Sequence, residues 1–277
     1  MAVEDSGSDR TREDKAAQID TTMPNPARAV DFVRGGRNNF EADRKAARAT
    51  VAAAPLAGIA ARAEHAFHGR VVRFLVAEAG VRQFLDIGTS LAVTGNTHDV
   101  AQSVDPRCRV VYVDSDPMVL AHARALLRSA PEGAVGYLDA DVQDSGAIIA
   151  GAGATLDLAR PAALLLMAMS TLAYMPDLEE AAAHVSSLLA ALPCGSYVAF
   201  YHVASDLHPA ILAAVRRWNQ ASLQPVTPRS EDEVAALVAG LDLVPPGLVP
   251  ICDWRPEPGD PRFDEVVPVY GVVARKP

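Results

Sequence analysis

The sequence predicts an α/β protein built around a mostly parallel sheet, and three observations support this prediction. From residue 81 onward, apolar runs of strand length alternate with segments that have helical spacing, which is typical of parallel sheets. The run RQFLDIG places Asp86 and Gly88 at the end of a strand, where α/β proteins bring their backbone close to a ligand. The next apolar run, RVVYVD, also ends in a carboxylate, Asp114.

Seven strands are expected, with helices on both faces of the sheet. The expected strands are residues 83–88, 110–114, 135–140, 162–168, 197–203, 248–254 and 269–275. The last two are joined by a proline-rich loop and not by a helix, so we expect them to be antiparallel neighbours. Helices are expected at residues 96–104, 117–127, 177–192, 209–221 and 230–239, and Asp116 is a typical N-cap before Pro117.

The distribution of apolar residues divides the chain into three segments. Residues 1–18 contain almost no large apolar side chain and are expected to be a disordered tail. Residues 19–80 are expected to be a helical extension, with helices near 27–34, from about 39, and over 57–79. Residues 81–277 are expected to form the α/β domain.

Composition excludes several classes of protein. A net charge of −9 argues against an undirected nucleic-acid-binding protein. The three cysteines are scattered, with no C-x-x-C pair, so neither a metal site nor a disulfide framework is expected. The amino terminus lacks the apolar region of a signal peptide, and no run approaches the ~18 apolar residues of a membrane span. We therefore expect a cytoplasmic monomer or homodimer with neither a membrane nor a nucleic-acid partner.

The two strand ends together indicate an adenosine-type ligand. In nucleotide-binding folds, an acid at the tip of the second strand accepts hydrogen bonds from ribose hydroxyls, which is the role expected of Asp114. Six residues separate Gly88 from Gly95, so the dinucleotide fingerprint G-x-G-x-x-G is absent. A looser turn of this kind suits a ligand without a pyrophosphate. The pattern therefore favours S-adenosylmethionine over NAD.

Five segments together resemble a known family: IDTTMPNPARAVDFVRGGRNNFEADR, FLDIGTSLAVTGNTHDVAQ, VVYVDSDPMVLAHARALL, YLDADV and YGVVARKP. They resemble the actinobacterial S-adenosylmethionine-dependent methyltransferase family that was long described as a domain of unknown function. The resemblance implies a Rossmann-like class I methyltransferase fold and S-adenosylmethionine as cofactor. It does not supply the methyl acceptor.

The residues expected to bind the cofactor lie at the strand ends and in the turns that follow them. They are Asp86, Gly88, Thr89, Asn96, Asp114, Ser115, Asp141, Val142 and Ser170. Asp86 and Gly88 would line the methionine half. Asp141 resembles the acid that accepts the adenine amino group, with the Val142 N–H directed to the ring, although Asp139 could be the inward-facing acid. The family tends to carry a Leu-His pair where this chain has Met169-Ser170, which weakens any assignment of a general base there.

The N-terminal block has two interpretations. Additions outside the sheet of this fold commonly cover the cofactor, and Gly35-Gly36 would suit a hinge. The alternative is a helical hairpin packed on the sheet edge. Candidates for contact with cofactor or acceptor are Arg28, Asp31, Gly35, Gly36, Asn39 and Tyr174. His202, at the end of the fifth strand, is a weak candidate for a catalytic base.

A methyltransferase acting on a small molecule is therefore the expected function. Because methyl transfer from a sulfonium needs no protonation of the leaving group, alignment of donor and acceptor can supply most of the rate, and the lack of an obvious base does not count against an enzyme. A protein that senses S-adenosylmethionine or S-adenosylhomocysteine without turnover remains the alternative. The sequence lacks the G-x-S-x-G elbow of a hydrolase.

Overall fold

The computed structural model describes residues 19–88, 91, 95–167 and 171–277. Its centre is a sheet in the order β3-β2-β1-β4-β5-β8-β6, with β7 also paired to β8. The strands are β1 (Gln83–Ile87), β2 (Arg109–Asp114), β3 (Ala134–Asp139), β4 (Ala163–Leu166), β5 (Tyr197–Val203), β6 (Asp242–Leu243), β7 (Val249–Pro250) and β8 (Val269–Arg275). β1 to β5 pair in parallel, whereas β8 is antiparallel to β5, β6 and β7. The predicted α/β class and the antiparallel terminal pair are confirmed.

Helices cover both faces of the sheet. They are α2 (Pro26–Val33), α3 (Glu41–Ala53), α4 (Leu56–Ala77), α5 (Thr97–Val104), α6 (Pro117–Leu126), α7 (Ser145–Ala152), α8 (Leu178–Ala190), α9 (Ala210–Asn219) and α10 (Glu231–Ala236), with the short 3-10 helix η1 (Thr171–Tyr174). Buried residues of α7, α8 and α10 share one core with Leu85 and Ile87. Those of α4 and α5 share the other core with Phe84. This division follows from the alternation of side chains along β1.

The structure differs from the sequence prediction in three places. The sheet has eight strands and not seven, because the two residues of β6 form an additional strand that pairs with the carboxyl-terminal end of β8. The strand expected over 248–254 is reduced to Val249–Pro250, since the chain turns after Pro250, whose carbonyl accepts a hydrogen bond from the Asp253 N–H. Helix α7 was not predicted; its glycines obscured the pattern, although Asp144 is an N-cap that accepts from the Ala147 N–H.

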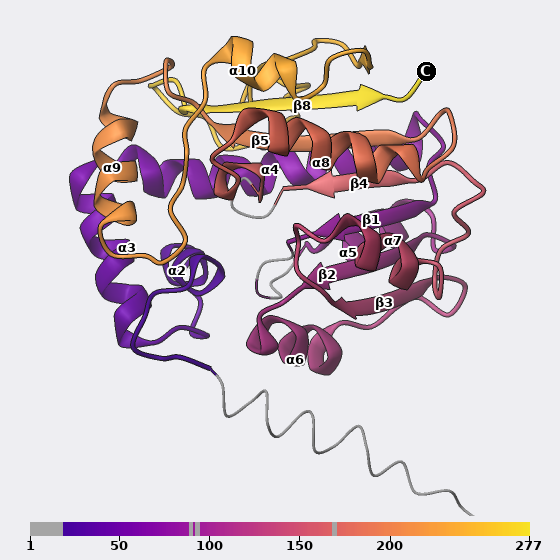
Figure 1. Ribbon diagram of the computed structural model, residues 1–277, viewed down its shortest axis with the longest axis horizontal. Coiled ribbons are helices and arrows are strands. Elements are labelled where there is room, and N and C mark those ends of the chain that lie inside the picture. Colours follow the sequence, from indigo (N-terminus) through magenta and orange to yellow (C-terminus); the bar gives the residue numbers. More distant parts are fainter. Residues whose placement is uncertain (1–18, 89–90, 92–94, 168–170) are drawn as a thin grey trace, which may run out of the picture.

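Helices α2, α3 and α9 stand together at one end of the sheet (Figure 1). Ala29, Ala46 and Ala47 of α2 and α3 pack against Trp218 of α9, and Ala54 packs against Ile211. These alanines let the helix backbones approach closely, and the indole fills the space between them. These contacts join α2 and α3 to α9, which comes much later in the sequence. The resulting block stands at the end of the sheet where β1 to β4 have their carboxyl termini.

Candidate functional site

A cleft of about 490 Å³ lies at the carboxyl ends of the parallel strands. Roughly 300–1,000 Å³ is usual for small-molecule and cofactor pockets. Strand ends and the turns after them contribute Gly88, Asp114, Ser115, Asp116, Asp141, Val142 and Gln143. The opposite wall consists of Asn25–Ala27 at the start of α2, Thr171 and Tyr174 of η1, and residues Leu223–Pro225. Open parallel sheets bind their ligands at this edge.

Gly88 ends β1 with a backbone conformation that suits glycine. Its φ is +74°, in the left-handed region that costs other residues roughly 1–2 kcal/mol. Its N–H donates to the Val113 carbonyl at 2.9 Å, so the turn remains tied to β2. The chain can therefore leave the sheet sharply without a side chain entering the cleft.

Asp86 lies behind the cleft and not in its lining. The side chain is 7% exposed, and its Oδ2 accepts a hydrogen bond of 2.6 Å from the Thr97 hydroxyl. His68 Nε2 lies 2.8 Å from the same hydroxyl. Burial raises the pKa of Asp86 to about 6, and the Thr97 hydrogen bond opposes this shift. Thr97 thus fixes the Asp86 carboxylate near the end of β1.

Asp114 supplies a half-buried carboxylate to the cleft. Its Oδ1 accepts a 2.9 Å hydrogen bond from the Asp116 N–H. Burial is the main cause that raises the pKa of Asp114 to about 8; the charges of Asp116 and Asp86 act in the same direction, and backbone hydrogen bonds act against it. A carboxylate can accept about four hydrogen bonds, so Asp114 retains capacity for ligand hydroxyls. Because burial disfavours the ionised form of Asp114, a ligand that donates hydrogen bonds to the carboxylate would stabilise it.

Asp116 links the strand tip to the N-terminal block. Its Oδ1 caps α6 by accepting from the Met118 N–H at 2.7 Å, as the sequence predicted. Its Oδ2 accepts a 2.8 Å hydrogen bond from the Asn25 side chain. Asn25 also begins α2, where its Oδ1 accepts from the Arg28 N–H. One wall of the cleft is therefore tied directly to the other.

The end of β3 provides the third polar group of the cleft. Asp141 is exposed and lines the cleft together with the half-buried Val142, whereas Asp139 is exposed and does not line it. The Asp141 Oδ1 accepts from the Gln143 N–H at 2.9 Å, which orients the carboxylate. Ser115 lies between the tips of β2 and α6 and is exposed to the cleft. Between the two acids left open by the sequence, the geometry favours Asp141.

Three other residues were expected to bind the cofactor, namely Asn96, Thr89 and Ser170. Asn96 is the N-cap of α5, and its backbone N–H and side chain both donate to Asp99 Oδ2 at 3.0 Å. It is absent from the lining of the cleft. Thr89 and Ser170 lie outside the described residues.

The residues present fit an adenosyl cofactor. A glycine turn of positive φ lies on one strand tip, and the neighbouring tips carry carboxylates with spare hydrogen-bonding capacity. A family model for S-adenosyl methyltransferases matches residues 12–277. The chain belongs to the S-adenosyl methyltransferase family. The predicted family and the predicted cofactor, S-adenosylmethionine, are confirmed.

Two solved structures are similar over nearly the whole methyltransferase. A DUF574 family protein from Streptomyces avermitilis is 38% identical with a TM-score of 0.89, over 94% of this chain and 100% of that one. A provisionally assigned methyltransferase from Thermobifida fusca is 37% identical with a TM-score of 0.83, over 93% of this chain and 96% of that one. No curated protein matches the chain.

The expected contact residues of the N-terminal block bond mainly to other residues of the same block. Arg28 is 4% exposed and forms an ion pair of 3.1 Å with the fully buried Asp43. Asp31 Oδ2 accepts from the Asn38 N–H and from the Asn39 side chain. Gly35 ends α2 at φ +84°, and a side chain at Gly36 would overlap the Asp31 carboxylate. These residues stabilise the turn between α2 and α3; none of them lines the cleft.

His202 is fully buried, with hydrogen bonds at both ring nitrogens. Nδ1 lies 3.0 Å from the Val203 carbonyl, and Nε2 lies 2.8 Å from Nη1 of the buried Arg229. Burial lowers its pKa to about 4. Arg229 Nη1 also donates to the Leu172 carbonyl at 2.8 Å, which holds η1 in place. This arrangement favours a structural role, and we leave His202 out of the proposed site.

Several residues of the cleft were not singled out in the sequence. Asn25, Pro26 and Thr171 lie in its lining, as do Leu223–Pro225. Asn25 could have been found as an N-cap before Pro26 within the N-terminal motif. The segment 223–225 carries no such signal, because its position depends on the packing of Trp218, whose indole N–H donates to the Gln224 carbonyl at 3.0 Å.

The described residues form neither a metal-binding cluster nor a membrane-spanning helix. Among them, no group of three or more His, Cys, Asp and Glu side chains is placed to hold a metal ion. No helix in the same residues has the length and apolar character needed to cross a bilayer.

Proposed function

We propose that this methyltransferase holds S-adenosylmethionine at the strand tips and methylates a small-molecule acceptor. Asp114 would bind the ribose hydroxyls, and Asp141 with Val142 would bind the adenine. The turn at Gly88, supported by Asp86 from behind, would receive the methionine half, with Ser115 at the adenosine rim. The observation that carries the assignment is the convergence of Gly88, Asp114 and Asp141 on one cleft.

The chain's contribution to catalysis is alignment. When bound, the cofactor supplies a methyl group on a positively charged sulfur. Holding the two reactants in line can contribute roughly 7–11 kcal/mol of barrier lowering. Two features of the cleft suit this task. The Asn25–Asp116 hydrogen bond joins its walls, and the hydrogen bond from Arg229 to the Leu172 carbonyl holds η1 in place at the strand ends.

A small acceptor is supported by the walls of the cleft. The start of α2 and residues 223–225 oppose the strand tips, so the cofactor would be enclosed from a second side. The net charge of −9 disfavours a nucleic acid as substrate. We also propose that residues 19–80 act as a cover over the cofactor, through Asn25–Ala27, and that the enzyme works in the cytoplasm.

Calorimetry with S-adenosylmethionine tests the assignment of the cleft. Charge-assisted hydrogen bonds contribute roughly 1.5–3 kcal/mol each, so Asp114→Ala should weaken binding at least about tenfold. Asp139→Ala is the matched control, because Asp139 ends the adjacent strand outside the cleft lining. Equal affinities of the wild type and Asp114→Ala would contradict the ribose assignment.

A further inference from the structure

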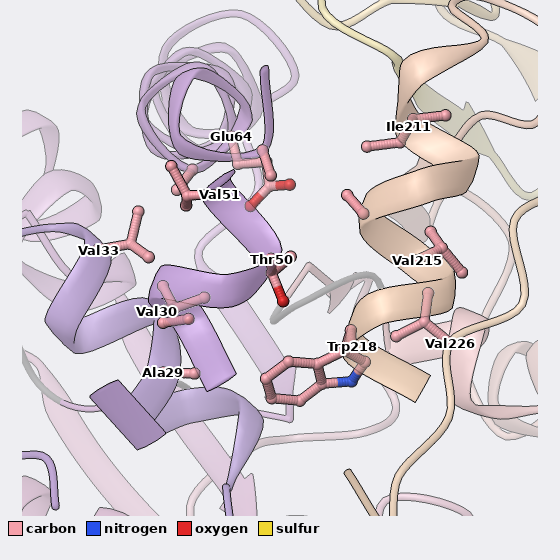
Figure 2. A pocket seen from close by; sticks show the side chains of 14 residues that line it. Ala29, Val30, Val33, Thr50, Val51, Glu64, Ile211, Val215, Trp218 and Val226 are labelled. Atoms are coloured by element: carbon pink, nitrogen blue, oxygen red, sulfur yellow. The ribbon is translucent and has the colours of Figure 1, made fainter. Parts of the chain in front are cut away.

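A second cavity, apolar in character, lies beside the cofactor cleft. It occupies about 140 Å³ between α2, α3, α4 and α9, and we call it the apolar chamber. Figure 2 shows side chains from these helices facing one another across it. Its walls include Val30, Val33, Val51, Ile211, Val215 and Trp218. A purely structural core would be filled by such side chains, so a remaining space of this size calls for an explanation.

The chamber and the cleft share two wall segments. The first turn of α2, Asn25–Ala27, lines the cleft, and the following residues, from Ala29 to Val33, contribute to the chamber. Residues Leu223–Pro225 line the cleft, and the next residue, Val226, lines the chamber. The two cavities are therefore neighbours on either side of the same helix and the same loop.

Glu64 is the only charged residue among the described residues that line the chamber. Its carboxylate points from α4 into the space facing α9 (Figure 2). The other polar side chains in the wall are engaged: the Thr50 hydroxyl donates to the Ala46 carbonyl and the Trp218 indole to the Gln224 carbonyl. Burial raises the pKa of Glu64, while the nearby Arg34 and a hydrogen bond with Tyr201 oppose the shift. A raised carboxyl pKa makes the group a better proton acceptor near neutral pH.

Tyr174 lines the cofactor cleft and is also close to Glu64. The charge of Glu64 contributes, after burial, to raising the pKa of the Tyr174 hydroxyl. That hydroxyl is buried and has no hydrogen-bond partner among the described residues. An orphaned buried hydroxyl costs roughly 1–3 kcal/mol, so a ligand group that bonds to it would be favoured.

We propose that the apolar chamber binds the body of the methyl acceptor and that Glu64 takes the proton from its nucleophile. This inference rests on the proposed function and names the acceptor class. The acceptor is a one-ring, largely apolar molecule with a single N–H or O–H nucleophile, directed toward Glu64 and Tyr174. An engineered cavity of about 150 Å³ binds benzene, so 140 Å³ suits one ring.

The chemical step balances with groups already named. The acceptor's N–H or O–H proton passes to the Glu64 carboxylate as the nitrogen or oxygen lone pair forms a bond to the methyl carbon. The carbon–sulfur bond breaks and its electron pair remains on sulfur. The products are the methylated acceptor, S-adenosylhomocysteine and protonated Glu64, which then loses the proton to water.

Binding of three matched probes tests the chamber without turnover. p-Cresol, p-toluidine and toluene share a ring and a methyl group, and only the first two carry a proton-bearing nucleophile. The chain has two tryptophans, so Trp254→Phe leaves Trp218, in the chamber wall, as the fluorescent reporter. We expect all three probes to change its emission, and p-cresol or p-toluidine to bind at least fivefold more tightly than toluene. Tighter binding of p-cresol would indicate an oxygen nucleophile in the acceptor, and tighter binding of p-toluidine a nitrogen nucleophile.

Two variants separate the chamber from the cleft. Val30→Trp should fill the chamber and weaken every probe at least tenfold. Glu64→Leu should remove the preference for p-cresol or p-toluidine over toluene, and Glu64→Gln should slow methylation of the preferred probe at least a hundredfold. S-adenosylmethionine affinity and the melting temperature of each variant show that the fold and the cleft are retained.

Either of two results would overturn the inference: probes that bind Val30→Trp as tightly as the wild type, or no preference for a proton-bearing probe in the wild type. Failure of the proposed function is distinct. It would appear as an absence of S-adenosylmethionine binding by the unsubstituted protein. Probe binding to the chamber is measured without cofactor, so its result does not depend on that outcome.

Discussion

The cofactor cleft and the apolar chamber are neighbours built in opposite ways. The cleft takes its polar groups from the ends of adjacent parallel strands, so each lies where the sheet topology dictates. The chamber takes apolar side chains from α2, α3 and α4 on one side and α9 on the other, elements separated in sequence by the parallel strands. With the roles proposed above, donor binding would depend on the sheet, whereas acceptor choice would depend on how the outlying helices pack.

The largest expected effect comes from breaking the buried ion pair inside the N-terminal block. Arg28→Met leaves the fully buried Asp43 without its 3.1 Å partner, which should cost about 3–5 kcal/mol of the stability of this block. Amides of α2 and α3 should then exchange hydrogen much faster, and probe binding to the chamber should be lost. Amides of β1 and β2 should change little.

Glu41→Gln is the matched control for that experiment, because it breaks the exposed pair with Arg44. Surface pairs contribute roughly 0–1 kcal/mol, so exchange should be nearly unaltered. If Arg28→Met accelerates exchange equally in the block and in the sheet, the two regions are one cooperative unit and the contrast between them is wrong.

The second expected effect is confined to the cleft and appears as pH dependence. Burial raises the pKa of Asp114 to about 8 in the ligand-free protein, and in the role proposed for Asp114 the ionised form would accept the ribose hydroxyls. Below pH 8 the proton must leave on binding, so S-adenosylmethionine affinity should rise about ninefold from pH 6 to 7, about fivefold from pH 7 to 8, and level off above. Calorimetry across this range should show it.

Asp114→Asn should flatten this profile. The folded pKa lies above the ordinary value of 3.8. From about pH 4 to pH 8 the unfolded chain releases the Asp114 proton while the ligand-free fold retains it, so the stability of the fold falls over this interval. The melting temperature of Asp114→Asn, relative to the wild type, should therefore rise over the same interval. A wild-type affinity that is constant between pH 6 and 8 would contradict the role given to Asp114.

The smallest expected effect concerns the link between the two regions. Asn25→Ala removes the 2.8 Å hydrogen bond to Asp116 and the cap of α2. Net hydrogen-bond contributions of roughly 0.5–1.5 kcal/mol correspond to a two- to tenfold loss of cofactor affinity. Asn38→Ala is the control, because Asn38 contributes a backbone N–H to the Asp31 interaction. Affinities unchanged in both variants would show that the cover does not act through Asn25.

Local sequence signals predicted the sheet and the helix starts well. The strand expected over 197–203 is β5 as observed, and Asp116 caps α6 as expected. Such elements depend on nearest neighbours: an apolar run, a cap and a breaking residue. The residues Gly88, Asp114 and Asp141 line one cleft because the ends of parallel strands meet at one edge, a rule that needs only the strand order.

The chamber could not be predicted in the same way. Glu64 looks in sequence like a polar position on a long amphipathic helix, and only the packing of α9 against α3 makes it face a cavity. For His202 the reverse holds. Its place at a strand end suggested that a ligand could reach it, whereas Arg229 covers its ring in the folded chain. Long-range packing partners of this kind leave no periodic signal in the chain.

The double use of α2 has a consequence for how the two ligands influence each other. A shift of this helix changes the volume of one cavity and the rim of the other at once, since its first turn lines the cleft and its later turns line the chamber. A molecule that stabilises α2 in its present position lowers the free energy needed to seat the second molecule. Such coupling is reciprocal, so with donor and acceptor bound as proposed, each should raise the affinity for the other.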